Sequence, residues 1–245
     1  MIEALGFLTI TGRARRPSPA AVSWFPLAGT VVGLAVGTSW WVAGEIWSPA
    51  VAAAVVVAVD LALTGLLHLD GLADSADGLL PHLSRERRLA VMAEPTVGAF
   101  ALGVVPVVLL LRWAALASLE PDVLLVAGLW CASRTLMAVA LSVLPYARAE
   151  GGLASAFLGA DADGADLRTP GPVALATALI GGNLALVLVA LGSSWAGAFG
   201  FAAAVVAGLL VLELARVRLG GHTGDVLGAT GLVAETAGLL VAAAW

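Results

Sequence analysis

Seven stretches of about 20 mostly apolar residues divide this 245-residue sequence. A helix that crosses a bilayer needs about 20 consecutive apolar residues. A single soluble core could not bury a chain that is 60% hydrophobic and 12% charged. The sequence therefore predicts an all-α, polytopic membrane helix bundle of about six or seven transmembrane helices, with spans near 24–44, 49–67, 98–119, 122–144, 172–191, 197–214 and 226–245.

Little of the chain remains for a soluble domain, so we expect a single integral-membrane catalytic domain over residues 1–245. The start does not resemble a signal peptide, because Glu3 comes early and the arginines follow the short apolar stretch 4–10. An interfacial helix is expected there. The single cysteine, Cys131, excludes an intrachain disulfide and a thiolate metal site.

The arginines indicate an orientation in the membrane. Ten of the twelve fall on one side of the expected spans: Arg13, Arg15, Arg16, Arg85, Arg87, Arg88, Arg148, Arg168, Arg216 and Arg218. The positive-inside rule places that side in the cytoplasm. We therefore expect a cell-membrane protein with a cytoplasmic N-terminus, an active site on the cytoplasmic side and, if there are seven spans, an external C-terminus.

Three aspartates follow the second apolar stretch. Asp70, Asp74 and Asp77 are spaced i, i+4 and i+7, so a helix would project them from one face. Three neighbouring carboxylates suit a hard divalent cation such as Mg²⁺, and the all-oxygen set argues against zinc. The alternative is a solvated helix end. His68, just before the triplet, is a candidate metal ligand, a general base, a hydrogen-bond donor to phosphate, or an ordinary buried histidine.

A second polar motif enters the last span from the arginine-bearing side. It reads Gly-Gly-His-Thr-Gly-Asp over residues 220–225. Glycines and a helix N-terminus expose backbone N–H groups to an anion, which makes Thr223 and Gly224 candidate substrate contacts. Asp225 is either a helix cap or a further metal-site carboxylate.

Charged residues also occur inside the apolar stretches. Arg112, Arg134 and Glu235 lie within expected spans, where a charge needs a partner or a wet cavity. We expect Arg134 to pair with a phosphate or a carboxylate, and Glu235 to point into the bundle. The glycine stripes 29/33/37 and 224/228/231/238 predict close helix packing.

The loops on the arginine-bearing side add further candidates. Arg85, Arg87 and Arg88 could contact phosphate, although the topology signal already accounts for them. Tyr146 could stack on a base or a corrin-sized ligand, or simply lie at the membrane interface. Arg148 follows it closely in the sequence.

Together these residues resemble the cobalamin synthase family, also called adenosylcobinamide-GDP ribazoletransferases. The matching segments are 25–29, 64–65, 68–79, 88–89, Met92 with Gly98, 133–134, 146–148, Gly221, 223–229 and Glu235. The chain departs from the family pattern at three places. Ala93-Glu94 stands where Arg-Asp is usual, Ala154 where a glycine is frequent, and His222 where glutamine or arginine is common.

The resemblance implies a transferase that joins adenosylcobinamide-GDP to α-ribazole, or to its 5′-phosphate, and releases GMP, with Mg²⁺ as cofactor. The expected metal ligands are Asp70, Asp74, Asp77, Glu94, Asp225 and Glu235. The expected catalytic residues are His68, Asp74 and Asp225, with the general base left open between His68 and Asp225. Substrate-binding residues would be Arg134, Tyr146, Arg148, Thr223 and Gly224.

The expected partners are these small molecules and the lipid bilayer, with no nucleic acid. The oligomeric state stays open, because lipid-facing and subunit-facing apolar surfaces look alike. One alternative function is a CDP-alcohol phosphotransferase acting on lipids. Its Asp-Gly-x-x-Ala-Arg motif is not matched, since the chain has no arginine between Asp70 and Arg85. The other is a cation transporter built on Asp60, Glu213 and Glu235.

Overall fold

The computed structural model describes residues 1–10, 18–148, 157 and 169–244. Within these ranges the chain forms helices and no β-strand, so the all-α prediction is confirmed. The elements are α1 (Ile2–Leu8), the 3₁₀ helix η1 (Pro19–Trp24), α2 (Phe25–Ile46), α3 (Pro49–Leu63), α4 (Leu67–Leu79), α5 (Arg85–Val91), α6 (Ala99–Ser118), α7 (Val123–Val143), α8 (Pro172–Leu219) and α9 (Gly224–Ala242).

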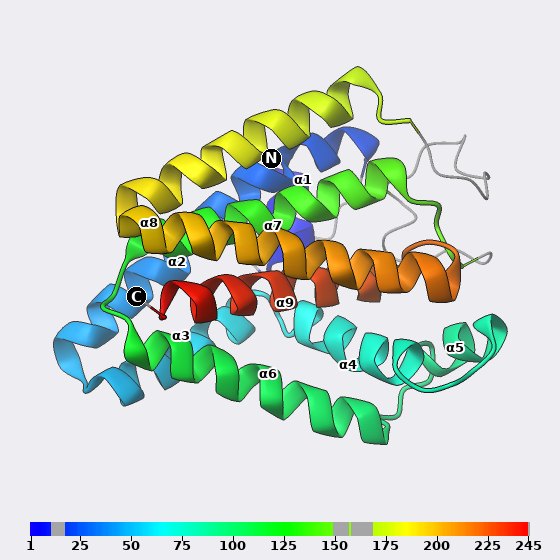
Figure 1. The fold of residues 1–245 in the computed structure, drawn as a ribbon, viewed down its shortest axis with the longest axis horizontal. Helices are drawn as coiled ribbons and strands as arrows, with labels where there is room; N and C mark the ends of the chain where they lie inside the picture. The colour runs from blue at the N-terminus through cyan, green and yellow to red at the C-terminus, as the bar shows by residue number, and fades with distance from the viewer. Residues whose placement is uncertain (11–17, 149–156, 158–168, 245) are drawn as a thin grey trace.

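Six helical segments of the described chain are long and apolar enough to cross a membrane, and α3 with α4 forms a seventh, bent candidate. The predicted polytopic bundle is therefore confirmed. Helix α8 supplies two of the spans, 172–193 and 195–219, because the chain folds back on itself between them (Figure 1). At this turn Gly197 approaches the Val189 carbonyl so closely that no side chain would fit.

The second expected span ends earlier than the sequence predicted. Helix α3 stops at Leu63, and α4 leaves it at an angle of 89°. Gly65 and Leu66 both adopt left-handed backbone conformations at the bend, with φ of 59° and 61°. The Ile10 backbone N–H donates to the Leu63 carbonyl at 3.0 Å, so the N-terminal segment satisfies an acceptor that the bend exposes.

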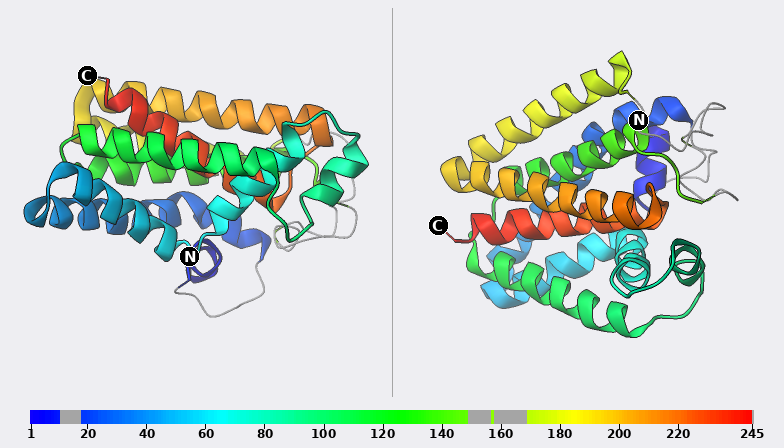
Figure 2. Two further views of the ribbon diagram at one scale, coloured as in Figure 1. Left: turned by 90° about the horizontal axis from the view of Figure 1, so that it is seen from below. Right: turned by 45° about the vertical axis from the view of Figure 1, so that its right-hand side comes forward.

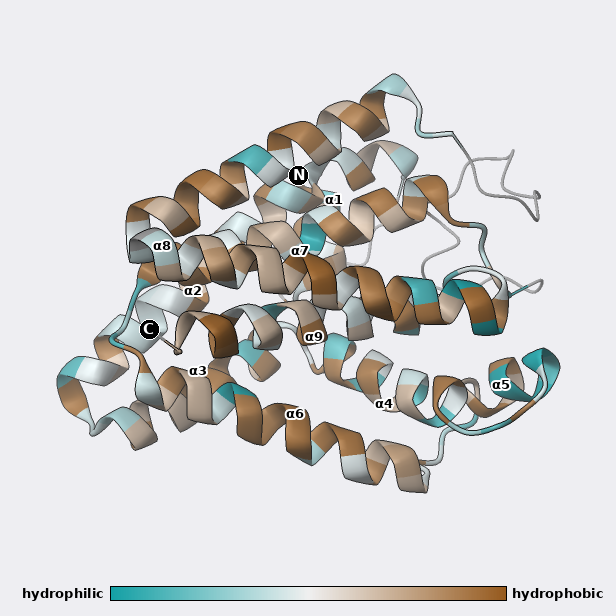
Figure 3. Ribbon diagram, viewed as in Figure 1, coloured by the Kyte–Doolittle hydropathy of each residue, from teal (hydrophilic) through white to brown (hydrophobic). Residues whose placement is uncertain are grey.

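Helix α7 forms the centre of the bundle and packs against α2, α8 and α9. A Cβ built on Gly29 or Gly33 would lie 2.5 Å from the Trp130 carbonyl oxygen or 2.7 Å from the Ala127 Cα. The first glycine stripe therefore packs α2 on α7, as the sequence predicted. Apolar residues cover the outer helices α6 and α8 (Figure 3).

Polar structure gathers at one end of the bundle. Helix α5, the C-terminal end of α8 and the start of α9 meet there, whereas the α2–α3 turn and the C-terminus lie at the other end (Figures 1 and 2). At this end, arginine side chains donate hydrogen bonds to backbone carbonyls of neighbouring helices. Arg88 donates to the Gly78 carbonyl at 2.7 Å, and Arg85 donates to the Leu219 carbonyl at 2.6 Å. Both arginines thus cap helix C-termini.

Candidate active site

Helices α4 and α9 cross closely and bring the two predicted polar motifs together. A Cβ on Gly71 would lie 2.7 Å from the Asp225 carbonyl oxygen, and one on Gly228 would lie 3.2 Å from the His68 Cα. Only glycine permits this approach of the two backbones. The crossing brings α4 against the start of α9, at the end of the bundle where α5 lies (Figure 2). Asp74 is then close enough to Asp225 to be affected by its charge.

The three aspartates of α4 lie on one helix, as predicted, but in different environments. Asp70 is exposed, Asp74 is partly buried and Asp77 is buried. The negative charges of Asp70, Asp77 and Asp225 all repel the carboxylate of Asp74. The burial of the three carboxylates therefore increases from Asp70 to Asp77, so they do not form a uniformly exposed acidic face.

Asp77 caps the N-terminus of α6. Its carboxylate accepts hydrogen bonds from the backbone N–H groups of Gly98 at 2.6 Å, Phe100 at 3.1 Å and Ala101 at 3.1 Å. A negative charge at this position also interacts favourably with the helix dipole. Asp77 thus ties the start of α6 to α4.

A pocket with a cavity volume of about 120 Å³ opens beside the α4–α9 crossing. Its polar lining includes His68, Asp70, Tyr146, Arg148 and Asp225. The rest of its wall is apolar or glycine: Phe7, Phe25, Leu67, Met137, Gly224, Leu227 and Gly228. Within this lining we call Asp70 and Asp225 the acidic part, and Phe7 and Phe25 the aromatic part.

Arg148 links the pocket's acidic part to the α5–α6 connection. Its guanidinium donates to the Asp225 carboxylate at 2.6 Å and to the Met92 carbonyl at 3.0 Å. The Thr223 hydroxyl also donates to Asp225, at 3.1 Å, and accepts from the Val226 N–H at 3.3 Å. Thr223 is thus the helix cap of α9, the role that the sequence offered as one alternative for Asp225.

Tyr146 lies at the pocket edge and is paired with the chain before α9. The Ala147 N–H donates to the His222 carbonyl at 2.8 Å, and the His222 N–H donates to the Pro145 carbonyl at 2.9 Å. The Tyr146 and His222 rings meet edge to face, with centroids 5.4 Å apart. Burial raises the pKa of the Tyr146 hydroxyl, so this group stays a neutral hydrogen-bond donor at neutral pH.

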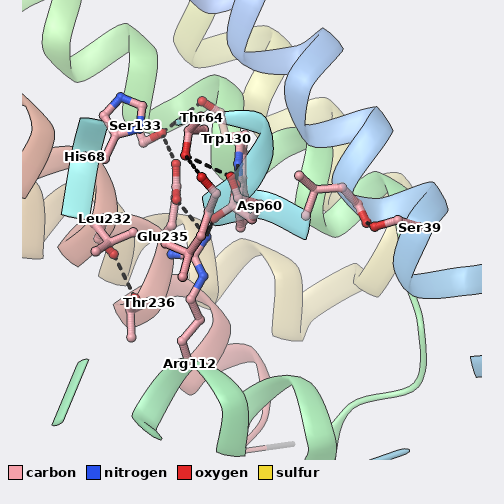
Figure 4. A network of polar contacts seen from close by, with 12 residues as sticks. Ser39, Asp60, Thr64, His68, Arg112, Trp130, Ser133, Leu232, Glu235 and Thr236 are labelled. Atoms are coloured by element: carbon pink, nitrogen blue, oxygen red, sulfur yellow. Dashed lines mark hydrogen bonds and ion pairs between the residues drawn. The ribbon is translucent and has the colours of Figure 1, made fainter. Parts of the chain in front are cut away.

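Arg134 and Glu235 meet deep in the bundle. The Arg134 guanidinium pairs with the Glu235 carboxylate, which also accepts from the Ser133 hydroxyl at 2.8 Å. Arg112 joins them, donating to Glu235 at 2.9 Å and to Asp60 at 2.7 Å (Figure 4). Arg134 thus pairs with a carboxylate, which is one of its two predicted alternatives, and is buried away from the pocket.

We name Asp60, Arg112, Arg134 and Glu235 the buried charge cluster. Its two carboxylates balance its two guanidinium groups, and every side chain is at least 95% buried. The Trp130 indole N–H donates to Asp60 at 3.2 Å, and Arg112 lies 4.5 Å from the centre of the Trp130 ring. The cluster joins α3, α6, α7 and α9 around one neutral centre.

His68 touches the buried charge cluster with one nitrogen. Its Nδ1 lies 3.4 Å from an Arg134 guanidinium nitrogen. Because a guanidinium only donates, Nδ1 fits this contact as an acceptor, and the ring hydrogen then belongs on Nε2. The contact therefore favours a histidine that offers an N–H donor rather than a free basic nitrogen.

Glu94 lies outside the pocket, on the exposed surface. It pairs with Arg87 at 3.0 Å, and the two side chains are 44% and 57% exposed. Arg87 is thus the member of the predicted α5 trio that contacts a carboxylate, whereas Arg85 and Arg88 cap helices. Ala154 and Arg168 lie outside the described residues.

The predicted metal ligands do not gather at one point. Among the residues that the structure describes, no three histidine, cysteine, aspartate or glutamate side chains are arranged to hold a metal. Asp77, Glu94 and Glu235 have the other partners given above. Asp70 and Asp225 line the pocket, and Asp74 lies within reach of their charges. Mg²⁺ typically needs only one or two protein carboxylates besides water and substrate phosphate. This oxygen donor set is compatible with such an ion.

Two features of the site were missed from the sequence. Phe7 comes from an N-terminal helix that gave no functional signal, yet it lines the pocket. Asp60 and Arg112 were both noticed as charges within apolar stretches, but their pairing was not predicted. Two opposite charges inside neighbouring spans are a signal that could have suggested it.

The comparisons with known proteins agree on one family. The family model of cobalamin-5-phosphate synthase matches residues 1–243. An adenosylcobinamide-GDP ribazoletransferase of Chlorobium phaeovibrioides is 34% identical over 96% of this chain and 91% of its own length. Proteins of the same name from Bradyrhizobium diazoefficiens and Chlorobaculum tepidum are 37% and 35% identical, covering 92% and 100% of this chain and 84% and 93% of their own.

No solved structure matches the chain. The family match nevertheless extends over every described helix, including the α4–α9 crossing and the pocket beside it. The resemblance first noted in the short motifs therefore holds over the whole length, and the chain belongs to the cobalamin-5-phosphate synthase family.

Proposed function

We propose that this protein joins adenosylcobinamide-GDP to α-ribazole, or to α-ribazole 5′-phosphate, in the last assembly step of the cobalamin nucleotide loop. The family match over residues 1–243 carries this proposal, together with relatives named for that activity. The pocket supports it, because carboxylates and an arginine at a helix N-terminus are groups that handle a charged phosphate and its metal ion.

The reaction requires one bond to form and one to break. The ribose 3′-hydroxyl oxygen attacks the cobinamide-linked phosphorus, the bond from that phosphorus to the oxygen bridging to GMP breaks, and GMP leaves with the bond electrons. The hydroxyl proton passes to a base. Arg148, which reaches the pocket, would lie against the phosphate oxygens and stabilise their charge.

We assign the base to Asp225 and a donor role to His68. The Nδ1 of His68 faces Arg134. Because a guanidinium only donates, we assign the ring hydrogen to Nε2, and in that tautomer neither nitrogen is free to accept the substrate's proton. Asp225 lies in the same pocket, at the first turn of α9. We expect His68→Gln, which keeps an N–H donor, to retain more activity than Asp225→Asn. The reverse order would move the base to His68.

We also propose Mg²⁺ as the cofactor, held by Asp70 and Asp74 together with the pyrophosphate of the substrate. When bound, the ion would neutralise phosphate charge. By the positive-inside rule, the pocket end of the bundle would face the cytoplasm, with the N-terminus on the same side. An external C-terminus follows if α3 and α4 together count as one span.

The test is GMP release by the purified protein in liposomes, supplied with adenosylcobinamide-GDP and α-ribazole, with and without Mg²⁺. We expect release only with both substrates and with the metal ion. No release under any condition would overturn the proposed reaction, and release without any divalent ion would overturn the cofactor assignment. Supplying CDP-alcohols and measuring CMP release tests the lipid-enzyme alternative, which the comparisons do not favour.

The transporter alternative also loses its physical basis. Asp60 and Glu235 are paired with Arg112 and Arg134 in the buried charge cluster. Glu213 pairs with Arg216 on the exposed surface, at 2.6 Å. These acids are therefore neutralised by fixed cations, and they do not form a chain of carboxylates available to a transported ion.

A further inference from the structure

The aromatic part of the pocket is a built feature rather than a chance gathering of side chains. Phe7 and Phe25 lie nearly parallel, with ring centroids 6.1 Å apart and planes 18° apart. Phe157 meets both rings edge to face, with centroid distances of 4.7 Å to Phe7 and 5.3 Å to Phe25. We call these three residues the phenylalanine wall.

The phenylalanine wall is held rigidly on its inner side. Phe25 is fully buried and Phe157 is 3% exposed, so neither ring has room to turn away. Phe7 and Phe25 are the members that line the pocket, and Phe7 is only partly buried. A planar ligand entering the pocket would therefore meet an aromatic surface already fixed in place.

Helix α1 places Phe7 at the pocket. Ala4 and Leu8 of this helix are fully buried against the bundle. The segment is also tied at two points: Glu3 accepts a hydrogen bond from the Ser18 hydroxyl at 2.6 Å, and the Ile10 N–H reaches the α3 terminus. These contacts give the N-terminal helix a packing role in the site, beyond the interfacial role that the sequence predicted.

The chemistry of the wall discriminates between the bases of the two substrates. Leu67, Met137 and Leu227 also line the pocket, with side chains that offer no strong hydrogen-bonding group, and Met137 and Leu227 belong to the same hydrophobic cluster as Phe25. Guanine would lose hydrogen bonds to water there without replacement, at a large cost. The benzimidazole of α-ribazole is flat and has a single free ring nitrogen, fewer polar groups than guanine, and its benzo ring and methyl groups gain from leaving water.

The two substrates also differ in size. The cavity volume of the pocket is about 120 Å³, so a compact, flat ring system fits it far more readily than the corrin ring system of the other substrate. A nucleoside with its base at the wall would extend its ribose toward the polar lining, where Arg148 and Asp225 lie.

We propose that the phenylalanine wall is the binding site for the apolar heteroaromatic base of the acceptor nucleoside, with α1 contributing Phe7 to that site. The proposal rests on the proposed function, because it assigns one end of the pocket to one of the two substrates. It names Phe7 and Phe25 as residues that set base specificity.

The decisive experiment measures how a substitution in the phenylalanine wall changes the KM for each of the two substrates. Phe7→Ala removes most of the exposed aromatic surface, and stacking losses of this kind weaken binding by roughly 10- to 100-fold. We expect the KM for α-ribazole to rise by about that factor, with the KM for adenosylcobinamide-GDP within about twofold of the parent value. Ile2→Ala is the matched control, because Ile2 lies on the same helix but is 68% exposed.

A second measurement keeps the test independent of catalysis and of folding. Titration calorimetry of the detergent-solubilised protein with α-ribazole alone should show binding that Phe7→Ala weakens and Phe7→Trp retains. Binding of α-ribazole without GMP release by the parent protein would reject the proposed function and leave the base site standing. Equal α-ribazole affinity in parent and Phe7→Ala, with activity present, would overturn the base site.

Discussion

Two regions of the protein gather charged side chains, and they differ in net charge. In the buried charge cluster, two carboxylates face two guanidinium groups, and all four side chains are almost inaccessible to water. Asp70, Arg148 and Asp225 line the pocket, and their charges act on the neighbouring Asp74. The first region is neutral. In the part of the chain that the structure describes, the second has three carboxylates and one arginine, an excess of negative charge that a cation would relieve.

On the proposed function, this difference would distinguish charges that hold the fold together from charges that take part in the reaction. Buried ions that satisfy one another fix the geometry of the helices that carry them, and removing one leaves its partner uncompensated. Carboxylates that repel one another near solvent cost stability and are retained where they bind or react. Four substitutions test the contrast, in order of decreasing expected effect.

Glu235→Ala should have the largest effect, because it leaves Arg112 and Arg134 buried with one carboxylate between them. Breaking a buried ion pair typically costs about 3 to 5 kcal/mol. We expect a large fall in the thermal unfolding temperature in detergent, together with a loss of folded yield. Glu213→Ala, at the exposed pair with Arg216, is the control and should unfold like the parent. Equal behaviour of the two variants would refute a structural role for the cluster.

Asp74→Asn should act in the opposite way. The substitution removes a charge that Asp70, Asp77 and Asp225 repel, so the unfolding temperature should stay the same or rise. The rate of GMP release should fall roughly 100- to 1000-fold, as expected when a group that stabilises charge at a reacting phosphate is lost. Glu86→Gln, an exposed change on α5, controls for general charge effects. Near-normal turnover of Asp74→Asn would remove Asp74 from the site.

Substitutions of Asp77 test whether this carboxylate only caps α6 or also takes part in the reaction. Asp77→Ala removes the cap of α6 and should cost about 0.5 to 2 kcal/mol of stability. Asparagine is also a good helix cap, so Asp77→Asn should recover most of the stability and of the activity. A variant that regains stability but has no activity would instead assign Asp77 to the metal site, as the sequence analysis expected.

Glu94 should give the smallest effect. Its pair with Arg87 is exposed, and pairs of this kind contribute about 0 to 1 kcal/mol. Glu94→Ala and Arg87→Ala should therefore have nearly the same unfolding temperature and GMP-release rate as the parent. A large rise in the Mg²⁺ concentration needed by Glu94→Ala alone would show that Glu94 reaches the metal during turnover.

The outline of the fold could be predicted because it depends on local properties of the chain. Apolar runs of membrane-spanning length identified the spans, and the Gly29 stripe indicated close packing on a neighbouring helix. The bend at Gly65 and Leu66 was not predicted, because two left-handed residues are set by the packing around them and not by hydropathy.

The site could be predicted only in part. Asp70, Asp74 and Asp225 were identified from spacing and motif, and the α4–α9 crossing does bring the two motifs together. Helical spacing grouped Asp77 with Asp70 and Asp74, and the family resemblance added Glu235 to the expected metal ligands, whereas in the structure Asp77 caps α6 and Glu235 pairs with arginines. Spacing gives the direction of a side chain on its own helix, but not which neighbouring helix faces it.

The sequence by itself determined that this chain is a helical membrane protein, where its arginines lie relative to its spans, and which family it resembles. These properties follow from the apolar area and charge of short segments. Only the tertiary structure decided which charges neutralise one another and that Phe7 reaches the pocket. Contacts between residues far apart in the chain depend on how the helices cross, and that is fixed by packing of the whole bundle.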